Sequence, residues 1–329
     1  MTVPEELKQI LNNDPENFRA LYSMALIFQN EKNYAGCFAM VERAISSYEN
    51  APDSDYQSFY FELKRLHTHL LRNHMEDILG PAYHLLDPHW VPVFKLGRPR
   101  EMAWTVTSNN ISYIQKAMNA PQLRKLRYLS ITFKESPDVA LNELFQCPLS
   151  ILRTLSLNFR ESPNYATLRA VFSNARPTIE NFSGFSLKMP KIDDSVAILV
   201  QSTFKTLDSL SLTSNTRTIS KAFCEVLADD PRSNQLTRLA LIGSSIGNQG
   251  LFTLFASENF GSLQVLDLRD GLLTNAAARI VLAGQYPPHL RTLDVRYNTI
   301  DPAGIDMLNR SALECLYDGQ HERPQSVRP

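Results

Sequence analysis

The stretch Leu236–Ser257 reads LTRLALIGSSIGNQGLFTLFAS, and the same pattern returns as LQVLDLRDGLLTNAAARIVLAG at Leu263–Gly284 and as LRTLDVRYNTIDPAGIDMLNRS at Leu290–Ser311. Each copy opens with LxxLxL or a close variant, in which alternate residues are apolar, as in a strand with one buried side. Each copy then continues with apolar residues at helical spacing. Because so short a unit cannot bury its apolar side alone, the copies must stack. The pattern predicts a solenoid with one parallel strand and one helix per coil.

The strand pattern extends upstream of these three copies. Seven copies begin at Leu126, Leu152, Phe182, Leu207, Leu236, Leu263 and Leu290. Subtracting successive first positions gives spacings of 26, 30, 25, 29, 27 and 27 residues. Met102 and Trp104 form a degenerate copy one period earlier. Their inward residues would form one continuous apolar core, in which each buried leucine contributes roughly 1.5–3 kcal/mol.

The second half of each coil is predicted to be helical. Apolar residues at helical spacing follow the strands in the segments 139–145, 166–172, 221–228, 251–257, 277–283 and 304–309. The expected fold class is therefore α/β, with parallel strands on one side of the solenoid and helices on the other.

These repeats resemble leucine-rich repeats of the ribonuclease-inhibitor type over residues 96–318, most closely after Leu236. The residues that match the family's asparagine and the following aliphatic position are Asn215, Ile246, Leu273, Asn298 and Ile300. Ser244 and Gly271 replace the asparagine in two copies. The resemblance implies strands on a concave side, helices on a convex side and a role in binding another macromolecule. It implies an adaptor, an inhibitor of an enzyme or a regulator of a small GTPase.

The region 1–95 differs from the repeats. Its pattern resembles one tetratricopeptide helix pair with a polar turn at Glu31–Asn33, on the residues Leu21, Met24, Ala25, Phe28, Tyr34, Cys37, Val41 and Ala44. A further helix is expected at about 55–79, and the segment Leu70–Pro81 has a weaker resemblance to bacterial repeat-companion domains. Since one such pair cannot stand alone, it either caps the first coil or forms a peptide-binding groove. The expected domains are a helical region at 1–95, the solenoid at 96–318 and a flexible tail at 319–329.

Composition weighs against several classes of partner. The chain has 33 Lys and Arg against 34 Asp and Glu, a net charge of -1, which argues against a nucleic-acid partner. The longest aliphatic run is 196–200, and the N-terminus lacks a signal-peptide pattern, so no membrane span and a cytoplasmic location are expected. Four separated cysteines, without a CxxC pair, predict reduced core thiols at Cys37, Cys147, Cys224 and Cys315.

Five of the seven histidines cluster at His67, His69, His74, His84 and His89. On a helix His67 and His74 would share one side two turns apart, so they are the candidate ligands of a metal site, with a metalloprotein as the alternative function. The HxH or HxxxH pairing with a nearby carboxylate is only half present, which favours structural or surface histidines. Phosphate-binding, nucleophile-elbow, zinc-helix and dinucleotide motifs are all absent from the sequence. We therefore expect neither an enzyme nor a cofactor.

If the protein binds a partner, the outward residues of the strands are the first candidates to contact it. These are small and neutral in the first copies and charged in the last ones. The candidate partner-binding residues are Arg238, Asp267, Arg269, Asp270, Asp294, Arg296 and Tyr297. Arginine and tyrosine are typical interface anchors. In the alternative interpretation Asp267 with Arg269, and Asp294 with Arg296, form cross-strand ion pairs worth under about 1 kcal/mol that only keep the sheet soluble.

Two aromatic residues leave a similar choice open. Phe133 and Phe159 fall at equivalent positions after the first two strands, where they are either core residues of neighbouring coils or a docking rim.

Overall fold

The computed structural model describes residues 4–50, 57–87, 92–95, 98–135, 137–147, 149–179 and 182–320. The chain divides into two compact units, Met1–Leu129 (unit 1) and Ser130–Pro329 (unit 2). The strands in the described residues form one ten-stranded sheet in chain order, β1 to β10. β1 is antiparallel to β2, and the other nine strands run parallel.

Unit 2 alternates strands and helices as the repeat pattern predicts. Its strands, with β3 beginning just before the unit boundary, are β3 (Tyr128–Phe133), β4 (Thr154–Phe159), β5 (Gly184–Met189), β6 (Ser209–Ser214), β7 (Arg238–Ile242), β8 (Val265–Asp267), β9 (Thr292–Asp294) and β10 (Glu314–Leu316). Its helices are α7 (Pro137–Phe145), α8 (Tyr165–Ile179), α9 (Asp194–Thr203), α10 (Lys221–Asp229), α11 (Gly247–Ala256), α12 (Asn275–Leu282) and α13 (Pro302–Asn309). Short 3-10 turns are η4 (Leu149–Ile151), η5 (Pro231–Gln235) and η6 (Glu258–Phe260).

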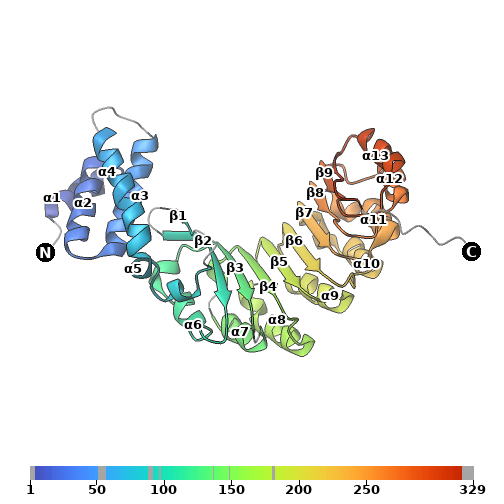
Figure 1. Cartoon of the computed structure of the whole chain (residues 1–329), viewed down its shortest axis with the longest axis horizontal. Helices are drawn as coiled ribbons and strands as arrows, with labels where there is room; N and C mark the ends of the chain where they lie inside the picture. Colours follow the sequence, from blue (N-terminus) through green and yellow to red (C-terminus); the bar gives the residue numbers. More distant parts are fainter. Residues whose placement is uncertain are drawn as a thin grey trace, which may run out of the picture. The chain divides into compact units, whose positions relative to one another are not determined.

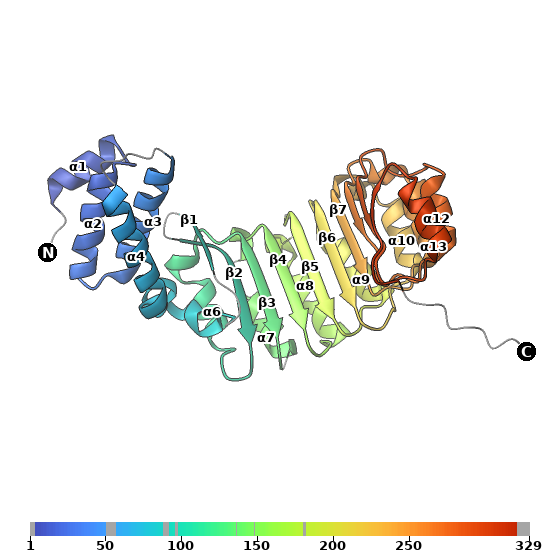
Figure 2. The same cartoon turned by 45° about the horizontal axis from the view of Figure 1, so that its top comes forward.

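The helices of unit 2 lie on one face of its sheet, as the two views of the chain show (Figure 1, Figure 2). We call the opposite side, which no described helix of unit 2 covers, the helix-free face. Several helices begin where a side chain accepts a hydrogen bond from the first turn: Asp193 from the amide of Val196 at 3.1 Å and Asp301 from that of Gly304 at 3.1 Å. These caps satisfy amides that lack a partner inside the helix, which fixes where each helix starts.

The predicted apolar core is confirmed. Leu239, Leu266 and Leu293 pair in register across β7, β8 and β9 and are at most 1% exposed. The burial of β3, β4 and β6 alternates strictly, with the inward side chains covered. Each strand therefore sends every second side chain to the helices and the others to the helix-free face.

Strand ends differ along unit 2. β4, β5 and β6 have six residues each, and their last inward positions hold Phe159, Met189 and Ser214, all buried. β8 and β9 have three residues each, and the buried amide of Asn298 holds the following turns. Its oxygen accepts from the amides of Gly271 and Leu273, both at 2.9 Å. Its nitrogen donates to the carbonyls of Leu268, Val295 and Arg296.

Asn298 thus occupies the asparagine position expected for it, and the aliphatic positions Ile246, Leu273 and Ile300 are buried. Ser244, which replaces the asparagine in its copy, is fully buried and donates to the carbonyl of Leu241 at 2.9 Å. The expectation for Asn215 is wrong, because its side chain is exposed. β6 runs straight through to Ser214, so the buried polar position falls one residue earlier and Ser214 fills it.

Unit 1 is mainly helical. Its elements are α1 (Glu5–Asn13), α2 (Phe18–Asn30), α3 (Tyr34–Asn50), α4 (Gln57–Asn73), α5 (Met75–Leu79), η2 (Gly80–Leu85), β1 (Val93–Lys95), β2 (Arg98–Val106), α6 (Tyr113–Met118) and η3 (Pro121–Leu123). The α2–α3 pair and its turn at Glu31–Asn33 lie where the sequence predicts them. Phe38 of α3 contacts the ring of Phe94 on β1 with centroids 4.7 Å apart, so the helix pair packs on the first strand. Met102 and Trp104 of the degenerate copy are fully buried on β2.

The helix expected at about 55–79 is interrupted. α4 ends at Asn73 and α5 begins at Met75, because His74 leaves the helical conformation with φ -133° and ψ 25°. The His74 ring stacks on Tyr34 of α3 with centroids 3.5 Å apart. Packing against α3 therefore accompanies a break that the helical pattern of apolar residues does not reveal. The residues 51–56 and the end of the tail, 321–329, lie outside the described residues.

The four cysteines are free thiols. Burial raises the pKa of Cys37 and Cys147 to about 11 and that of Cys224 to about 12. Cys315, on the last strand, is half-buried. Three of the four are core thiols, as predicted. In the described part of the chain, no helix is both long and apolar enough to cross a membrane.

Candidate binding surface on the helix-free face

The outward residues of β7, β8 and β9 form rows across the sheet. Since the leucines of these strands point inward, the residues on either side of each leucine point to the helix-free face. One row runs Arg238, Val265 and Thr292, and the next runs Ala240, Asp267 and Asp294. Arg269 and Arg296 follow β8 and β9 at the equivalent position two residues beyond the aspartates.

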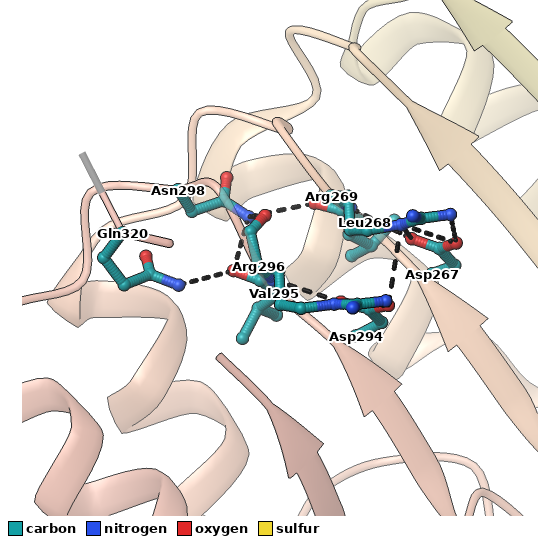
Figure 3. A network of polar contacts seen from close by, with 8 residues as sticks. All are labelled: Asp267, Leu268, Arg269, Asp294, Val295, Arg296, Asn298 and Gln320. Atoms are coloured by element: carbon teal, nitrogen blue, oxygen red, sulfur yellow. Dashed lines mark hydrogen bonds and ion pairs between the residues drawn. The ribbon is translucent and has the colours of Figure 1, made fainter. Parts of the chain in front are cut away.

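Asp267, Arg269, Asp294 and Arg296 form a connected network, which we call the Asp–Arg ladder (Figure 3). Arg269 donates from Nε to Asp267 Oδ1 at 3.0 Å and from Nη2 to Oδ2 at 2.8 Å. Arg296 donates to Asp294 in the same way, at 2.9 and 2.6 Å. In both pairs the arginine's backbone amide also donates to the aspartate at 3.2 Å. Each aspartate therefore binds the arginine of its own strand end, and the expectation that these two pairs cross between strands is wrong.

The ladder is joined across the strands by one contact. Arg269 Nε lies 3.5 Å from Asp294 Oδ2. Asp267 and Asp294 are in register on neighbouring strands, where two like charges would repel each other, and Arg269 lies close to both. The hydrogen bond with Asp267 is the main cause that raises the pKa of Arg269, and the one with Asp294 raises that of Arg296. Both guanidinium groups are held in place and stay charged.

The structure brings five of the seven predicted residues together around one hollow of about 550 Å³. Arg238 and the four ladder residues line it. Its other lining residues are Ser209, Leu210, Ser211, Leu239, Ala240, Ile242, Val265, Thr292 and Leu316. The sequence pattern identified the charged residues, but the hollow itself depends on how neighbouring strands follow one another in space.

Asp270 and Tyr297 do not line this hollow. Both lie in the turns just after the ladder, with φ 53° and 60°. Asp270 forms an ion pair with Arg217 from the turn after β6. Tyr297 is 47% exposed, and a Cβ added to Gly319 would lie 2.5 Å from its ring, so that glycine allows the close packing of the tyrosine. These two residues lie beside the hollow and could contact only a partner that extends over the turns.

The backbone behind the ladder is held by amide side chains. Asn298 binds the carbonyls of Leu268 and Arg296, next to the ladder residues. Gln320 donates to the carbonyl of Val295 at 2.8 Å (Figure 3) and accepts from the amide of Ile300 at 3.1 Å. Sequence reasoning missed Gln320, since no repeat position marks it. Such supporting bonds keep the ladder in one geometry.

The candidate metal ligands His67 and His74 each contact an aromatic ring and an acidic side chain. His67 stacks on Phe38 and contacts the carboxylate of Glu42. His74 contacts Asp77 at 3.2 Å besides stacking on Tyr34. In the described residues no group of three or more histidine, cysteine or acidic side chains is arranged to hold a metal ion. His89 lies outside the described residues.

Phe133 and Phe159 are core residues of neighbouring coils. Their rings stack with centroids 4.7 Å apart and an interplanar angle of 7°. Both are at most 3% exposed, so they offer no docking rim.

The architecture follows from three observations. The strands are nearly evenly spaced along the sequence, a helix follows most of them, and the buried Asn298 joins neighbouring coils. The fold is a leucine-rich-repeat solenoid preceded by a helical region. No protein-family model matches the chain, and no curated protein matches it in sequence. A crystal structure of a protein from Bacteroides fragilis is similar in fold, with a TM-score of 0.53 at 14% identity over 80% of this chain and 85% of that one.

Two further solved structures have lower TM-scores against this chain. The yeast Rad7–Elc1 complex gives a TM-score of 0.42 at 13% identity, over 96% of this chain and 87% of the other. The TLR13–ssRNA13 complex gives 0.35 at 16% identity, over 69% and 29%.

Proposed function

We propose that this protein is a non-enzymatic scaffold or adaptor that holds a partner protein in the hollow on the helix-free face of unit 2. The observation that carries the proposal is the Asp–Arg ladder, which presents fixed, charged guanidinium groups at the edge of an open hollow. Arginines held in this way can bind a partner with little loss of side-chain freedom.

The lining of the hollow favours a protein partner over a small molecule. It contains no aromatic side chain among the described residues, and five of its members are charged. Sites for small ligands are mostly apolar and aromatic with only a few polar groups. Interfaces with proteins more often combine arginine anchors with a polar rim.

Finer features of the proposal rest on the sequence pattern. The repeat spacing, with a helix in most coils, supports a solenoid of the ribonuclease-inhibitor type over 96–318, and the α2–α3 pair supports a tetratricopeptide-like helical region at 1–95. Free thiols are typical of a reducing compartment, which supports a cytoplasmic location. An inhibitor of an enzyme or a regulator of a small GTPase would use the same face and differ only in what its partner does.

Photo-cross-linking from inside the hollow tests the proposal. Ala240 is half-buried on β7 and lines the hollow, whereas Arg279 is exposed on α12, on the opposite face. Benzoylphenylalanine placed at Ala240 should yield a discrete cross-linked partner in cells, and at Arg279 it should not. Equal cross-linking from both positions would contradict the proposal.

A further inference from the structure

We infer that the hollow on β6–β9 selects an acidic segment of its partner, whose carboxylates bind Arg238 and the outward-facing guanidinium nitrogens of Arg269 and Arg296. This inference rests on the proposed function and names the chemistry of its partner.

The charged hydrogen-bond acceptors of the hollow are already occupied by donors of the protein itself. Asp267 and Asp294 each accept hydrogen bonds from the amide, Nε and Nη2 of one arginine. Their side chains are only 16% and 8% exposed. Neither carboxylate therefore offers a free face to a basic partner. A lysine or arginine of a partner would have to displace a bidentate pair, which is among the stronger hydrogen-bonded contacts in proteins.

The donors of the hollow, by contrast, are still available. Arg269 and Arg296 bind their aspartates through Nε and Nη2, and in the described structure neither uses Nη1 for a protein contact. Both side chains remain 32% and 31% exposed. Arg238 is exposed on the next strand, and its guanidinium group has no ion-pair or hydrogen-bond partner among the described residues, since only its backbone amide donates, to the carbonyl of Asp208. A ligand that completes this site must supply acceptors.

The net charge of the residues that line the hollow also favours an acidic ligand. Among the lining residues, three arginines face two aspartates, an excess of one positive charge (3 - 2 = 1). Outside the lining, the carboxylate of Glu314 on β10 accepts a hydrogen bond from Thr292 at 3.0 Å. Ala240, Ile242 and Val265 add an apolar strip beside the arginines. An acidic segment with an apolar side chain would contact both parts of the hollow.

A protein segment fits these observations better than a nucleic acid does. The chain has a net charge of -1 and the lining of the hollow an excess of only one positive charge, whereas a nucleic-acid site usually neutralises several phosphates. Single carboxylates match the planar, two-pronged donors of separate guanidinium groups.

The test uses the full-length protein and three labelled probes measured by fluorescence anisotropy. These are a glutamate-rich peptide containing leucine, the same peptide with glutamine in place of glutamate, and a single-stranded oligonucleotide. We expect saturable binding of the glutamate peptide that weakens with added salt, and no binding of the glutamine peptide. Arg238→Glu should weaken the glutamate peptide by about tenfold or more, since it removes a donor and adds a repelling charge. Arg279→Glu makes the same charge change on the helix-covered face and should leave binding unchanged.

The outcomes separate the inference from the function on which it rests. Equal binding or no binding of the two peptides, preference for the oligonucleotide, or unchanged binding by Arg238→Glu would each overturn the inference. If any of these occurs while Ala240 still cross-links a partner, only the acidic specificity fails. Loss of both signals overturns the proposed function as well. Thermal unfolding of Arg238→Glu, whose side chain is exposed, checks that the variant is folded.

Discussion

The coils built on β4–β6 and those built on β8 and β9 bury leucines in the same way but end their strands differently. In the first group the strand continues for six residues, and Phe159, Met189 or Ser214 fills one more inward position. In the second group the strand stops after three residues, and the chain turns at Asp270 and Tyr297 with positive φ. Asn298 satisfies the backbone of those turns.

This difference decides where charged side chains can be held. In the short-strand coils the turn brings the arginine's own amide to the aspartate two residues earlier, so its guanidinium folds back onto the same carboxylate. The long strands have no such turn at that position, and their outward residues are mostly serine, threonine and asparagine, with Gly184 and Lys188 the exceptions on β4–β6. The binding surface is therefore a consequence of strand length as well as of residue type.

The largest expected effect comes from the core that both regions share. Leu266→Asp places a charge without a partner at a fully buried position between Leu239 and Leu293. We expect it to lower the free energy of unfolding by more than about 4 kcal/mol, measured by urea denaturation. The control is Leu272→Asp, the same substitution at a leucine that is 42% exposed, which should stay folded. A cooperative, fully stable Leu266→Asp protein would falsify the strand register.

The next effect concerns the junction between the two kinds of coil. Gly243 has φ 65°, and a Cβ added there would lie 1.9 Å from the carbonyl oxygen of Ser214. Gly243→Ala should cost about 3 kcal/mol in denaturant unfolding, because strain and a backbone clash add together. Gly284 has φ 74° but no atom within 4 Å of the added Cβ, so Gly284→Ala should cost only about 1 kcal/mol of backbone strain. If both variants lose the same free energy of unfolding, the close approach to the Ser214 carbonyl does not contribute to stability.

A pair of asparagines tests the comparison directly. Asn298→Ala leaves the buried amides of Gly271 and Leu273 without their acceptor and should cost about 2 kcal/mol. Asn215→Ala, where the sequence pattern but not the structure places the repeat's asparagine in the long-strand group, removes only an exposed side chain and should change stability by less than about 0.5 kcal/mol. Both values come from urea midpoints. If the two variants are equally destabilised, the two groups of coils do not end their strands differently.

The smallest expected effect is one of reactivity. Burial raises the pKa of the Cys147 and Cys224 thiols to about 11 and about 12, so at pH 8 nearly all of each remains protonated and unreactive. Cys315 is half-buried on β10 and should react first with a thiol reagent in the native protein. Mass spectrometry of the labelled peptides identifies the order. Labelling of Cys224 ahead of Cys315 without denaturant would contradict the packing around α10.

Sequence reasoning recovered the parts of the fold that depend on period. Leucines at fixed spacing specified the buried core because strand alternation and coil stacking follow directly from residue order. It failed where the structure depends on the three-dimensional path of the chain and not on the repeat period. Asn215 matches the repeat but lies outside because β6 runs one residue further, and the expected helix of unit 1 breaks at His74. The ladder's residues were predicted, whereas the hollow and the role of Gln320 depend on contacts between coils.

The hydrogen bonds of Asn298 also set a direction along the solenoid. Several of them reach back to Leu268, Gly271 and Leu273 in the coil before it, and Gln320 reaches back in turn to Val295. Each coil near the end thus fastens the one that precedes it. When the chain is pulled from its C-terminus, resistance should come first from Gln320 and next from Asn298, so the last coils would peel away in sequence. The hydrogen bonds between coils would then break one after another under mechanical load.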